Sequence, residues 1–246
     1  MELFYAAPHQ ISDSVITLDE FESRHLIQTL KKKPGDTITI TDGQGNVYQA
    51  SIKQSGKKVP LQIIAKEHTA RDNWHLTLAI GFIRPNRLDT LIEKCTELGV
   101  DQFILFRSRY SNYASLNSER YIKIMRQAIK QSQRYYLPEL QIKSDLEQLF
   151  TQCSSFDHKL MALSARAPAL LGRMKTWDAS VKKSILMVVG PEGGFSDEEV
   201  DAFINHGFET VALAASRLRT ETAAMSSIAI IQSYYHHLKE AEFGTG

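Results

Sequence analysis

The residues best suited to chemistry lie where an apolar run opens into a glycine-rich loop. Residues 185–189 are apolar, and Gly190-Pro-Glu-Gly-Gly-Phe195 follows them directly. In an open α/β sheet, ligands bind beyond the carboxyl ends of the strands, and glycine lets the backbone approach a ligand closely. The pattern therefore predicts a ligand-binding loop, although an ordinary tight turn has the same composition.

The residues after this loop indicate which ligand charge it accepts. Ser196 and Glu199 have the spacing of a capping box, which begins a helix. Asp197, Glu198 and Glu199 place negative charge at the positive end of that helix, so a phosphate would be repelled there. No Lys-Ser or Lys-Thr pair follows the glycines, as it does in a P-loop. We therefore expect a neutral or cationic ligand, and a nucleotide-phosphate enzyme is disfavoured.

A second junction between a loop and a helix carries Arg219. An apolar strand is expected to end near Leu213, and a long helix is expected to begin near Thr220. Thr220 or Thr222 can cap this helix, and Glu221 suits its positive end. A cation is unfavourable there, so we expect Arg219 to serve a carboxylate, a phosphate or a reacting base.

A third segment, residues 107–143, is strongly basic. Its net charge is +6 in a chain whose total is +1. Five basic residues share one arc of an expected helix, opposite an apolar arc: Arg120, Lys123, Arg126, Lys130 and Arg134. Tyrosines flank this basic arc: Tyr110, Tyr113, Tyr135 and Tyr136. Cations interleaved with aromatic rings suit RNA, whereas the alternative is a solvated amphipathic face.

The elements that position these residues change character near residue 70. Before it, short strands separated by glycine-containing turns predict a small barrel or curled sheet, with one helix over 18–30. These strands are expected at 36–42, 47–52 and 61–64. After it, strands are expected at 76–82, 103–106, 160–163, 185–189 and 210–213, and helices at 86–98, 118–134, 196–206 and 220–238. Strands that alternate with helices predict an α/β fold with a parallel sheet.

The composition excludes several classes of protein. The 246 residues are 43% hydrophobic, which is enough for a sizeable core in one or two domains. Cys95 and Cys153 lack the spacing of a disulfide framework or a zinc site, so no metal is expected. Residues 1–10 have neither the basic nor the apolar region of a secretory signal. No apolar run reaches the length of about 18 residues that spans a membrane, and we expect a cytoplasmic protein.

Six motifs occur in a specific order over nearly the whole chain. They are Asp42-Gly-Gln-Gly45, Lys94-Cys-Thr-Glu-Leu-Gly-Val100, Arg107-Ser108, Gln131-Ser-Gln-Arg134 with Pro138-Glu139, Gly190-Pro-Glu-Gly-Gly-Phe195 and Leu218-Arg-Thr-Glu-Thr-Ala223. Together they resemble the RsmE family of the SPOUT superfamily. Its members are methyltransferases that modify uridine N3 in 16S ribosomal RNA of the small subunit.

The resemblance implies a fold, a cofactor and an assembly. It implies an N-terminal PUA-like β-barrel over residues 1–70 that helps to hold RNA. It also implies a C-terminal SPOUT methyltransferase domain over 73–246, whose parallel sheet carries a deep trefoil knot. The knot loops would bind S-adenosylmethionine, and two subunits would form a homodimer. The implied cofactor-binding residues are Leu163, Ser164, Val189, Gly190, Pro191, Glu192, Gly193, Gly194, Leu213, Leu218, Thr220 and Ala223.

The resemblance and the charge pattern together nominate catalytic and RNA-binding residues. Arg219 is the candidate for stabilising the charge that develops when uridine loses its N3 proton, with Arg107 and Arg109 as rivals. Glu221 is a candidate general base, although its position at the helix start explains it equally well. The residues expected to bind RNA are Arg24, Lys31, Arg107, Arg109, Arg120, Lys123, Arg126, Lys130 and Arg134.

The chain departs from the family's pattern at four places. Lys31 stands where Arg is common, Lys130 replaces a Glu, and Ala214 replaces a Gly. Ser216-Arg217 replaces Arg-Ile, so Arg217 is expected to supply the lost cation one position later. The alternative function is a non-catalytic RNA-binding module with a SPOUT-like fold. The intact 190–194 loop argues against that alternative, and a cofactor-binding test discriminates between the two.

Overall fold

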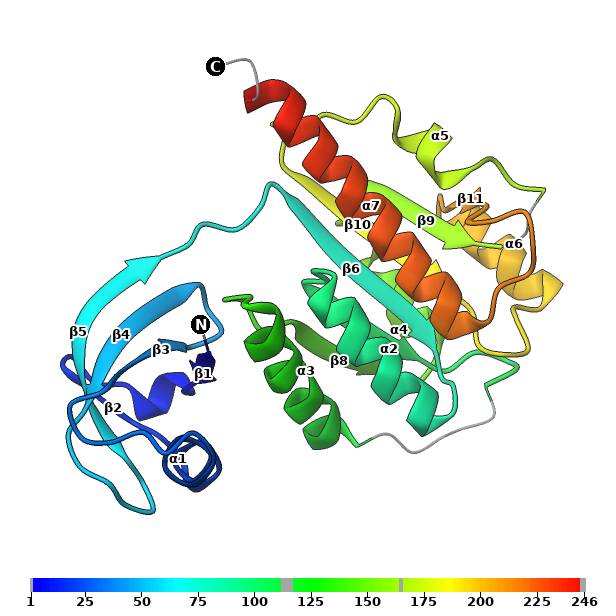
Figure 1. Cartoon of the computed structure of the whole chain (residues 1–246). Coiled ribbons are helices and arrows are strands. Elements are labelled where there is room, and N and C mark those ends of the chain that lie inside the picture. Colours follow the sequence, from blue (N-terminus) through cyan, green and yellow to red (C-terminus); the bar gives the residue numbers. More distant parts are fainter. Residues whose placement is uncertain (1, 112–116, 164–165, 244–246) are drawn as a thin grey trace. The chain divides into compact units, whose positions relative to one another are not determined.

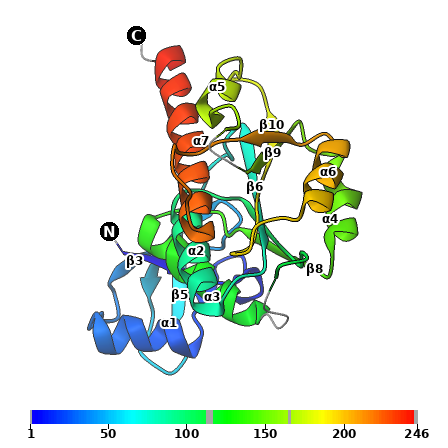
Figure 2. The same ribbon diagram turned by 90° about the vertical axis from the view of Figure 1, so that its right-hand side faces the viewer.

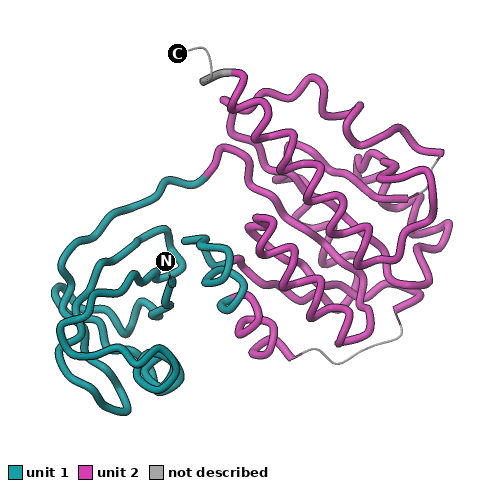
Figure 3. Tube along the Cα trace, viewed as in Figure 1, with its two compact units in different colours: residues 1–71, 126–137 teal, residues 72–125, 138–246 magenta. Residues whose placement is uncertain are grey.

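The described part of the chain, residues 2–111, 117–163 and 166–243 of a computed structural model, divides into two units (Figures 1 and 3). Unit 1 comprises residues 1–71 and 126–137, and unit 2 comprises residues 72–125 and 138–246. The sequence pattern predicts residues 126–137 as part of the second domain, whereas in the structure they pack in unit 1 with the N-terminal residues.

Unit 1 is built on a five-stranded sheet in the order β1-β3-β4-β5-β2. The strands are β1 (Leu3–Tyr5), β2 (Val15–Thr17), β3 (Thr37–Thr41), β4 (Asn46–Ile52) and β5 (Pro60–His68). Alternation in β4 buries Tyr48, Ala50 and Ile52 in the core, as period-two spacing requires. The predicted small β unit is therefore confirmed. The edge strands β1 and β2 were not predicted, because three residues are too few to show alternation.

The helix that the pattern predicts over 18–30 consists of two shorter pieces. The Asp19 side chain accepts a hydrogen bond from the Glu22 amide at 2.8 Å and begins α1 (Glu20–Arg24). A π-helical turn, His25–Thr29, continues it and buries Leu26 in the core of unit 1. Lys31 then adopts a left-handed conformation with φ of 54°, which ends the helical segment.

The later segment of unit 1, residues 126–137, is fixed to the N-terminal residues by backbone and side-chain contacts. Gly43 and Gly45 exchange backbone hydrogen bonds with Leu137 and Tyr135, each 2.9 Å long. Near the middle of the segment, the Lys130 ammonium lies 2.5 Å from the Glu22 carboxylate. Their side chains are only 15% and 7% exposed, so this is a largely buried ion pair. Burial raises the pKa of the Glu22 carboxyl above its ordinary value, and the nearby Lys130 charge opposes that rise.

Unit 2 contains a six-stranded, wholly parallel sheet in the order β11-β9-β10-β6-β7-β8. Its strands are β6 (Trp74–Gly81), β7 (Gln102–Phe106), β8 (Glu139–Lys143), β9 (His158–Ala162), β10 (Lys183–Val189) and β11 (Glu209–Val211). The α/β class and the parallel sheet are therefore confirmed. Strand β8 was not predicted, because its residues are polar and partly exposed at the sheet edge.

Helices cover both faces of this sheet (Figure 2). They are α2 (Pro85–Glu97), α4 (Leu146–Cys153), α5 (Leu170–Met174), α6 (Asp197–Asn205) and α7 (Thr220–Phe243), and a further helix, α3 (Ser118–Ser132), begins in unit 2 and ends in unit 1. Helices α2 and α7 pack together on one face, while α4 and α6 bury Phe150 and Phe203 against the other. The apolar arc predicted for α3 is confirmed by the burial of Tyr121, Met125 and Ile129. The trefoil knot stays a prediction.

The buried pair of Glu22 and Lys130 yields a prediction about stability. Lys130→Met should destabilise unit 1 by about 3 kcal/mol at neutral pH, because a buried carboxylate loses its counter-charge. The pKa of Glu22 should then lie further above its unfolded value. Stability should therefore return as the pH falls and the carboxyl is protonated. Urea unfolding followed by circular dichroism at neutral and mildly acidic pH measures both effects.

The matched control removes both charges at once. The double variant Glu22→Gln, Lys130→Met should have a free energy of unfolding closer to that of the wild type than Lys130→Met alone has, since no unpaired charge stays buried. If the stability loss of Lys130→Met did not change with pH, Lys130 would not be the counter-charge of a buried Glu22 carboxylate.

Candidate active site

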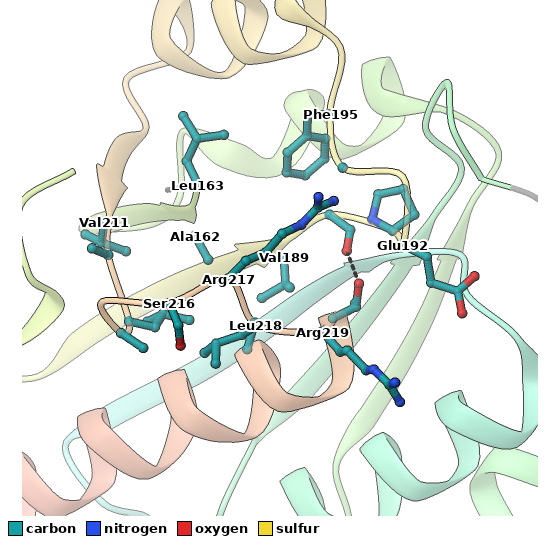
Figure 4. Close-up of a pocket in the computed structure, with 18 of the residues that line it drawn as sticks. Ala162, Leu163, Val189, Glu192, Phe195, Val211, Ser216, Arg217, Leu218 and Arg219 are labelled. Atoms are coloured by element: carbon teal, nitrogen blue, oxygen red, sulfur yellow. Dashed lines mark hydrogen bonds between the residues drawn. The ribbon is translucent and has the colours of Figure 1, made fainter. Parts of the chain in front are cut away.

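A pocket of about 740 Å³ lies in unit 2 at the carboxyl ends of β9, β10 and β11 (Figure 4). Three chain segments, the last of which runs into α7, and Arg87 of α2 form its walls. The lining residues are Arg87, Ala162, Leu163, Val189, Gly190, Pro191, Glu192, Gly194, Phe195, Val211, Ala212, Leu213, Ala214, Ser216, Arg217, Leu218, Arg219, Thr220 and Ala223. The ends of parallel strands meet at one sheet edge, so segments far apart in the sequence converge here.

The pocket brings together most of the residues expected to bind a cofactor. Of those expected residues, Leu163, Val189, Gly190, Pro191, Glu192, Gly194, Leu213, Leu218, Thr220 and Ala223 line it. Gly193 does not line it, and Ser164 lies outside the described residues, as does Tyr113 of the basic segment. The pocket also includes Arg87 and Phe195, which were not expected. No periodicity connects Arg87 of α2 to the glycine-rich loop.

The side chain of Thr220 joins two walls of the pocket. Its hydroxyl is buried and donates a hydrogen bond to the Gly190 carbonyl oxygen at 3.0 Å (Figure 4). The predicted capping role of Thr220 is therefore replaced by a link between the start of α7 and the loop after β10. Arg219 holds the position before the helix, since its carbonyl accepts the first helical hydrogen bond from Ala223 at 2.8 Å.

The protein's own structure requires glycine at two positions of the loop. A side chain at Gly193 would lie 2.7 Å from the Tyr110 Cβ atom, and Gly194 has a φ of +77° that favours glycine. Gly193 was expected to leave room for a ligand, but the structure shows that it leaves room for Tyr110. The loop is thereby packed against the segment that follows β7.

The predicted capping box at the start of α6 is confirmed. The Ser196 hydroxyl accepts from the Glu199 amide at 3.3 Å, and the Glu199 carboxylate accepts from the Ser196 amide at 2.9 Å. The second oxygen of Glu199 accepts from the Arg109 amide at 2.7 Å. This buried carboxylate therefore fastens the loop to the chain after β7. The exposed side chain of Arg109 pairs with Glu198 at 3.0 Å.

A group of opposite charges borders the pocket. The Arg87 Nη1 atom lies 2.9 Å from Glu192 Oε1, and its Nε atom lies 3.9 Å from Glu221 Oε1. Arg84 approaches Glu192 only to 3.9 Å. Glu221 is not among the lining residues, and it points its charge at Arg87. The geometry gives Glu221 a structural contact and no position facing the pocket.

Two arginines of the loop before α7 carry charge without a carboxylate partner among the described residues. The guanidinium of Arg217 points toward Phe195, whereas that of Arg219 points away from it (Figure 4). Both residues are exposed. Arg217, one of the departures from the family's pattern, therefore places the cation that Ser216 lacks beside the pocket.

The basic arc predicted on α3 is not a uniform surface. Arg120 pairs with Asp89, Arg126 lies over the Tyr5 ring at 4.8 Å, and Lys130 pairs with Glu22. Arg120 and Lys123 belong to unit 2, whereas Arg126, Lys130 and Arg134 belong to unit 1. Within the described residues, Lys123 and Arg134 have no such partner. Of the other expected RNA-binding residues, Arg24, Lys31 and Arg107 are exposed.

Two further features concern the described residues as a whole. They contain no group of three or more His, Cys, Asp or Glu side chains arranged to hold a metal ion. Among the same residues, no helix is both long enough and apolar enough to cross a membrane.

The chain matches two family models. Residues 70–232 match the RNA methyltransferase domain, and residues 18–61 match the RNA methyltransferase PUA domain. The second match agrees with the predicted PUA-like nature of the N-terminal unit.

Individual relatives extend over most of the chain. A protein named ribosomal RNA small subunit methyltransferase E from Synechocystis sp. is 28% identical over 92% of this chain and 76% of its own length. A protein of the same name from Bacillus subtilis is 27% identical, covering 85% of this chain and 86% of its own.

A solved structure resembles this fold closely. It is a ribosomal RNA small subunit methyltransferase E from Neisseria gonorrhoeae bound to S-adenosyl methionine. It has 28% sequence identity and a TM-score of 0.84, and the match covers 95% of this chain and 98% of that one.

The link between Thr220 and Gly190 yields a prediction. Thr220→Val keeps the side-chain shape but leaves the buried Gly190 carbonyl unpaired, so we expect a loss of about 1–3 kcal/mol in stability. Thr222→Val is the matched control, because Thr222 lies in the same helical turn but is exposed. Thermal unfolding of both variants measures the difference. Equal melting temperatures would show that the link contributes nothing.

Proposed function

The chain belongs to the RNA methyltransferase domain family, and we propose that it uses S-adenosylmethionine to methylate uridine N3 in 16S ribosomal RNA of the small subunit. The observation that carries the proposal is the pocket at the carboxyl edge of the sheet, which the motif residues 190–195 and 218–223 help to form. The names of the relatives and the cofactor of the similar solved structure support the substrate and the methyl donor.

The pocket suits S-adenosylmethionine in size and lining. Its volume of about 740 Å³ lies within the range of small-molecule sites. Leu163, Val189, Leu213 and Leu218 offer apolar contacts for an adenine ring, while the loop backbones offer donors and acceptors. When bound, the cofactor supplies a methyl group on a cationic sulfur. We propose the lining residues of the three loops as the cofactor site.

Arg219 is the residue that we propose to act on the substrate. Methylation at N3 requires the uracil ring to lose a proton, so negative charge develops on its edge. A guanidinium placed there stabilises that charge. Because Arg219 has no carboxylate partner among the described residues, its charge is available to RNA. The rival Arg109 is less suited, since its side chain already pairs with Glu198.

The position of Glu221 does not suit a general base. As a general base it would have to reach the substrate proton within hydrogen-bonding distance or through one water. Its carboxylate instead faces Arg87 and lies outside the pocket lining. We therefore propose a structural role for Glu221 and no longer propose it as the base.

RNA binding is proposed for exposed cations that no intramolecular carboxylate neutralises. Arg107 and Lys123 of unit 2 meet this condition among the described residues, as does Arg24 of unit 1, and Arg134 of unit 1 is partly exposed and has no carboxylate partner there. Lys130 does not, because Glu22 neutralises it. Phosphate contacts by such residues give affinity without sequence preference.

We also propose a knotted homodimer that works in the cytoplasm, on the strength of family likeness. The exposure pattern of α7 supports the dimer. Ile228, Ile231 and Tyr235 are buried within this chain, while Ile230 and Tyr234 stay partly exposed. A helix with a second apolar strip can bury it against another partner.

The chemical role of Arg219 yields a prediction. Arg219→Ala should slow single-turnover methylation of ribosomal RNA by about 10²–10³-fold at saturating cofactor, as removal of a charge-stabilising donor does. Arg219→Lys should recover only part of the rate, because a point charge cannot replace a planar guanidinium. Quench-flow assays with labelled cofactor measure the rates.

Calorimetric titration with S-adenosylmethionine accompanies these assays. Wild type and Arg219→Ala should bind it alike. Wild-type protein that binds no cofactor would indicate a non-catalytic RNA-binding module instead. A near-wild-type rate for Arg219→Ala would exclude the role given to this residue.

The distribution of free cations yields a prediction about RNA. Replacing both Arg107 and Lys123 by Ala should reduce the slope of log affinity against log salt by about 1.4, the value for two single-strand phosphate contacts. The double variant Glu22→Gln, Lys130→Met should leave the slope unchanged, since it removes no net charge. Filter binding at several salt concentrations measures the slopes, and equal slopes for all three proteins would refute the assignment.

A further inference from the structure

The three arginines that line the pocket differ in their surroundings. Arg217 and Arg219 have no carboxylate partner among the described residues, whereas Arg87 contacts two carboxylates. Arg87 lies on α2, outside all the motifs that identify the family. Its position needs a separate explanation.

The guanidinium of Arg87 spans two walls of the pocket. Glu192, 2.9 Å from Nη1, belongs to the loop after β10. Glu221, 3.9 Å from Nε, belongs to the first turn of α7. These are the same two segments that the hydrogen bond from Thr220 to Gly190 joins. Arg87 therefore provides a second connection between them, from the side of α2.

Both carboxylates depend on this contact. The side chains of Glu192 and Glu221 are only 22% and 16% exposed. Glu192 Oε1, which is the oxygen that Arg87 approaches, and Glu221 Oε2 are both inaccessible to solvent, and neither accepts a hydrogen bond from the described residues, so the charge of Arg87 is what offsets their burial. Two such acids beside one pocket repel each other unless a cation lies between them. Arg84 is a poor substitute at Glu192, because its side chain is 59% exposed against 30% for Arg87, and it lies 3.9 Å from Glu192 Oε1 whereas Arg87 lies 2.9 Å from it.

We infer that Arg87 is a positioning residue for the cofactor, which holds the loop after β10 and the start of α7 together before the ligand binds. This inference rests on the proposed function. A site that is already ordered binds more tightly, because the ligand does not have to supply the free energy of ordering. Arg87 therefore acts through Glu192 and Glu221 and takes no part in the methyl transfer itself.

The test is the affinity for S-adenosylmethionine. Arg87→Gln should raise the Kd in calorimetry by roughly tenfold, the scale on which interactions couple at 1–2 kcal/mol. The Kd of Arg87→Lys should lie between those of the wild type and Arg87→Gln, because an ammonium cannot contact both carboxylates as a planar guanidinium does. The matched control is Arg84→Gln, which removes the same charge from the same helix end and should keep the Kd within about twofold.

A second arm tests whether Arg87 acts through Glu192. Glu192→Gln should weaken binding on its own, and the double variant with Arg87→Gln should bind no worse than the weaker single variant. Such non-additivity is expected only for residues in contact. The single-turnover rate at saturating cofactor should change less than threefold in Arg87→Gln, since the bound ligand then orders the walls.

Three results would overturn the inference. An unchanged Kd with a lower melting temperature would make Arg87 a structural residue only. An unchanged Kd with a strongly reduced saturating rate would make it a contact of the reacting base. Additive effects of Arg87→Gln and Glu192→Gln on the binding free energy would show that Arg87 does not act through Glu192. Wild-type protein that fails to bind the cofactor would instead remove the proposed function, and the inference with it.

Discussion

The pocket depends on one constraint. Its walls consist largely of loops, so contacts within the protein must hold these loops in place. The hydrogen bond from Thr220 to the Gly190 carbonyl is the central one, since it joins the loop after β10 to the start of α7. Glu199 fastens the other end of the same loop to the Arg109 amide. The sheet fixes only where the strands end, and these side-chain links fix the direction in which each loop continues from its strand. The loop residues are thereby held at the pocket, where the proposed cofactor would meet their backbone donors and acceptors.

Short-range patterns were sufficient for much of the fold. The strands of the parallel sheet other than β8 contain or overlap apolar runs, and Ser196 and Glu199 are three residues apart, so both were predictable from the sequence. The contacts that complete the site were not. Arg87 of α2 meets Glu192 only because the fold brings the loop after β10 to that helix, and Lys130 meets Glu22, which is 108 positions away in the sequence. Neither has a signature in spacing or composition. Strands β1, β2 and β8 were missed for a related reason: they are short or polar, and they pair at sheet edges.

The basic segment shows how charge counted along a chain differs from charge available to a partner. A helical projection treats α3 as one surface, but its residues belong to two units. Lys130 stands where the family usually has a glutamate. Its contact with the buried Glu22 carboxylate explains this lysine. Arg126 lies over Tyr5, and Arg120 pairs with Asp89. The net charge of +6 over residues 107–143 therefore overstates what an RNA phosphate would meet.

The glycine-rich loop resolves the alternatives that its sequence leaves open. A tight turn and the proposed ligand-binding loop are compatible explanations, because residues of one segment pack against the protein and also line the pocket. Gly193 must lack a side chain because Tyr110 occupies that space, and a side chain at Gly81 would meet Pro191 at 2.5 Å. These contacts press the loop against the neighbouring segments, and the resulting path leaves Gly190 and Gly194 in the pocket wall. Close packing on the protein side is thus what allows the backbone to be exposed on the ligand side.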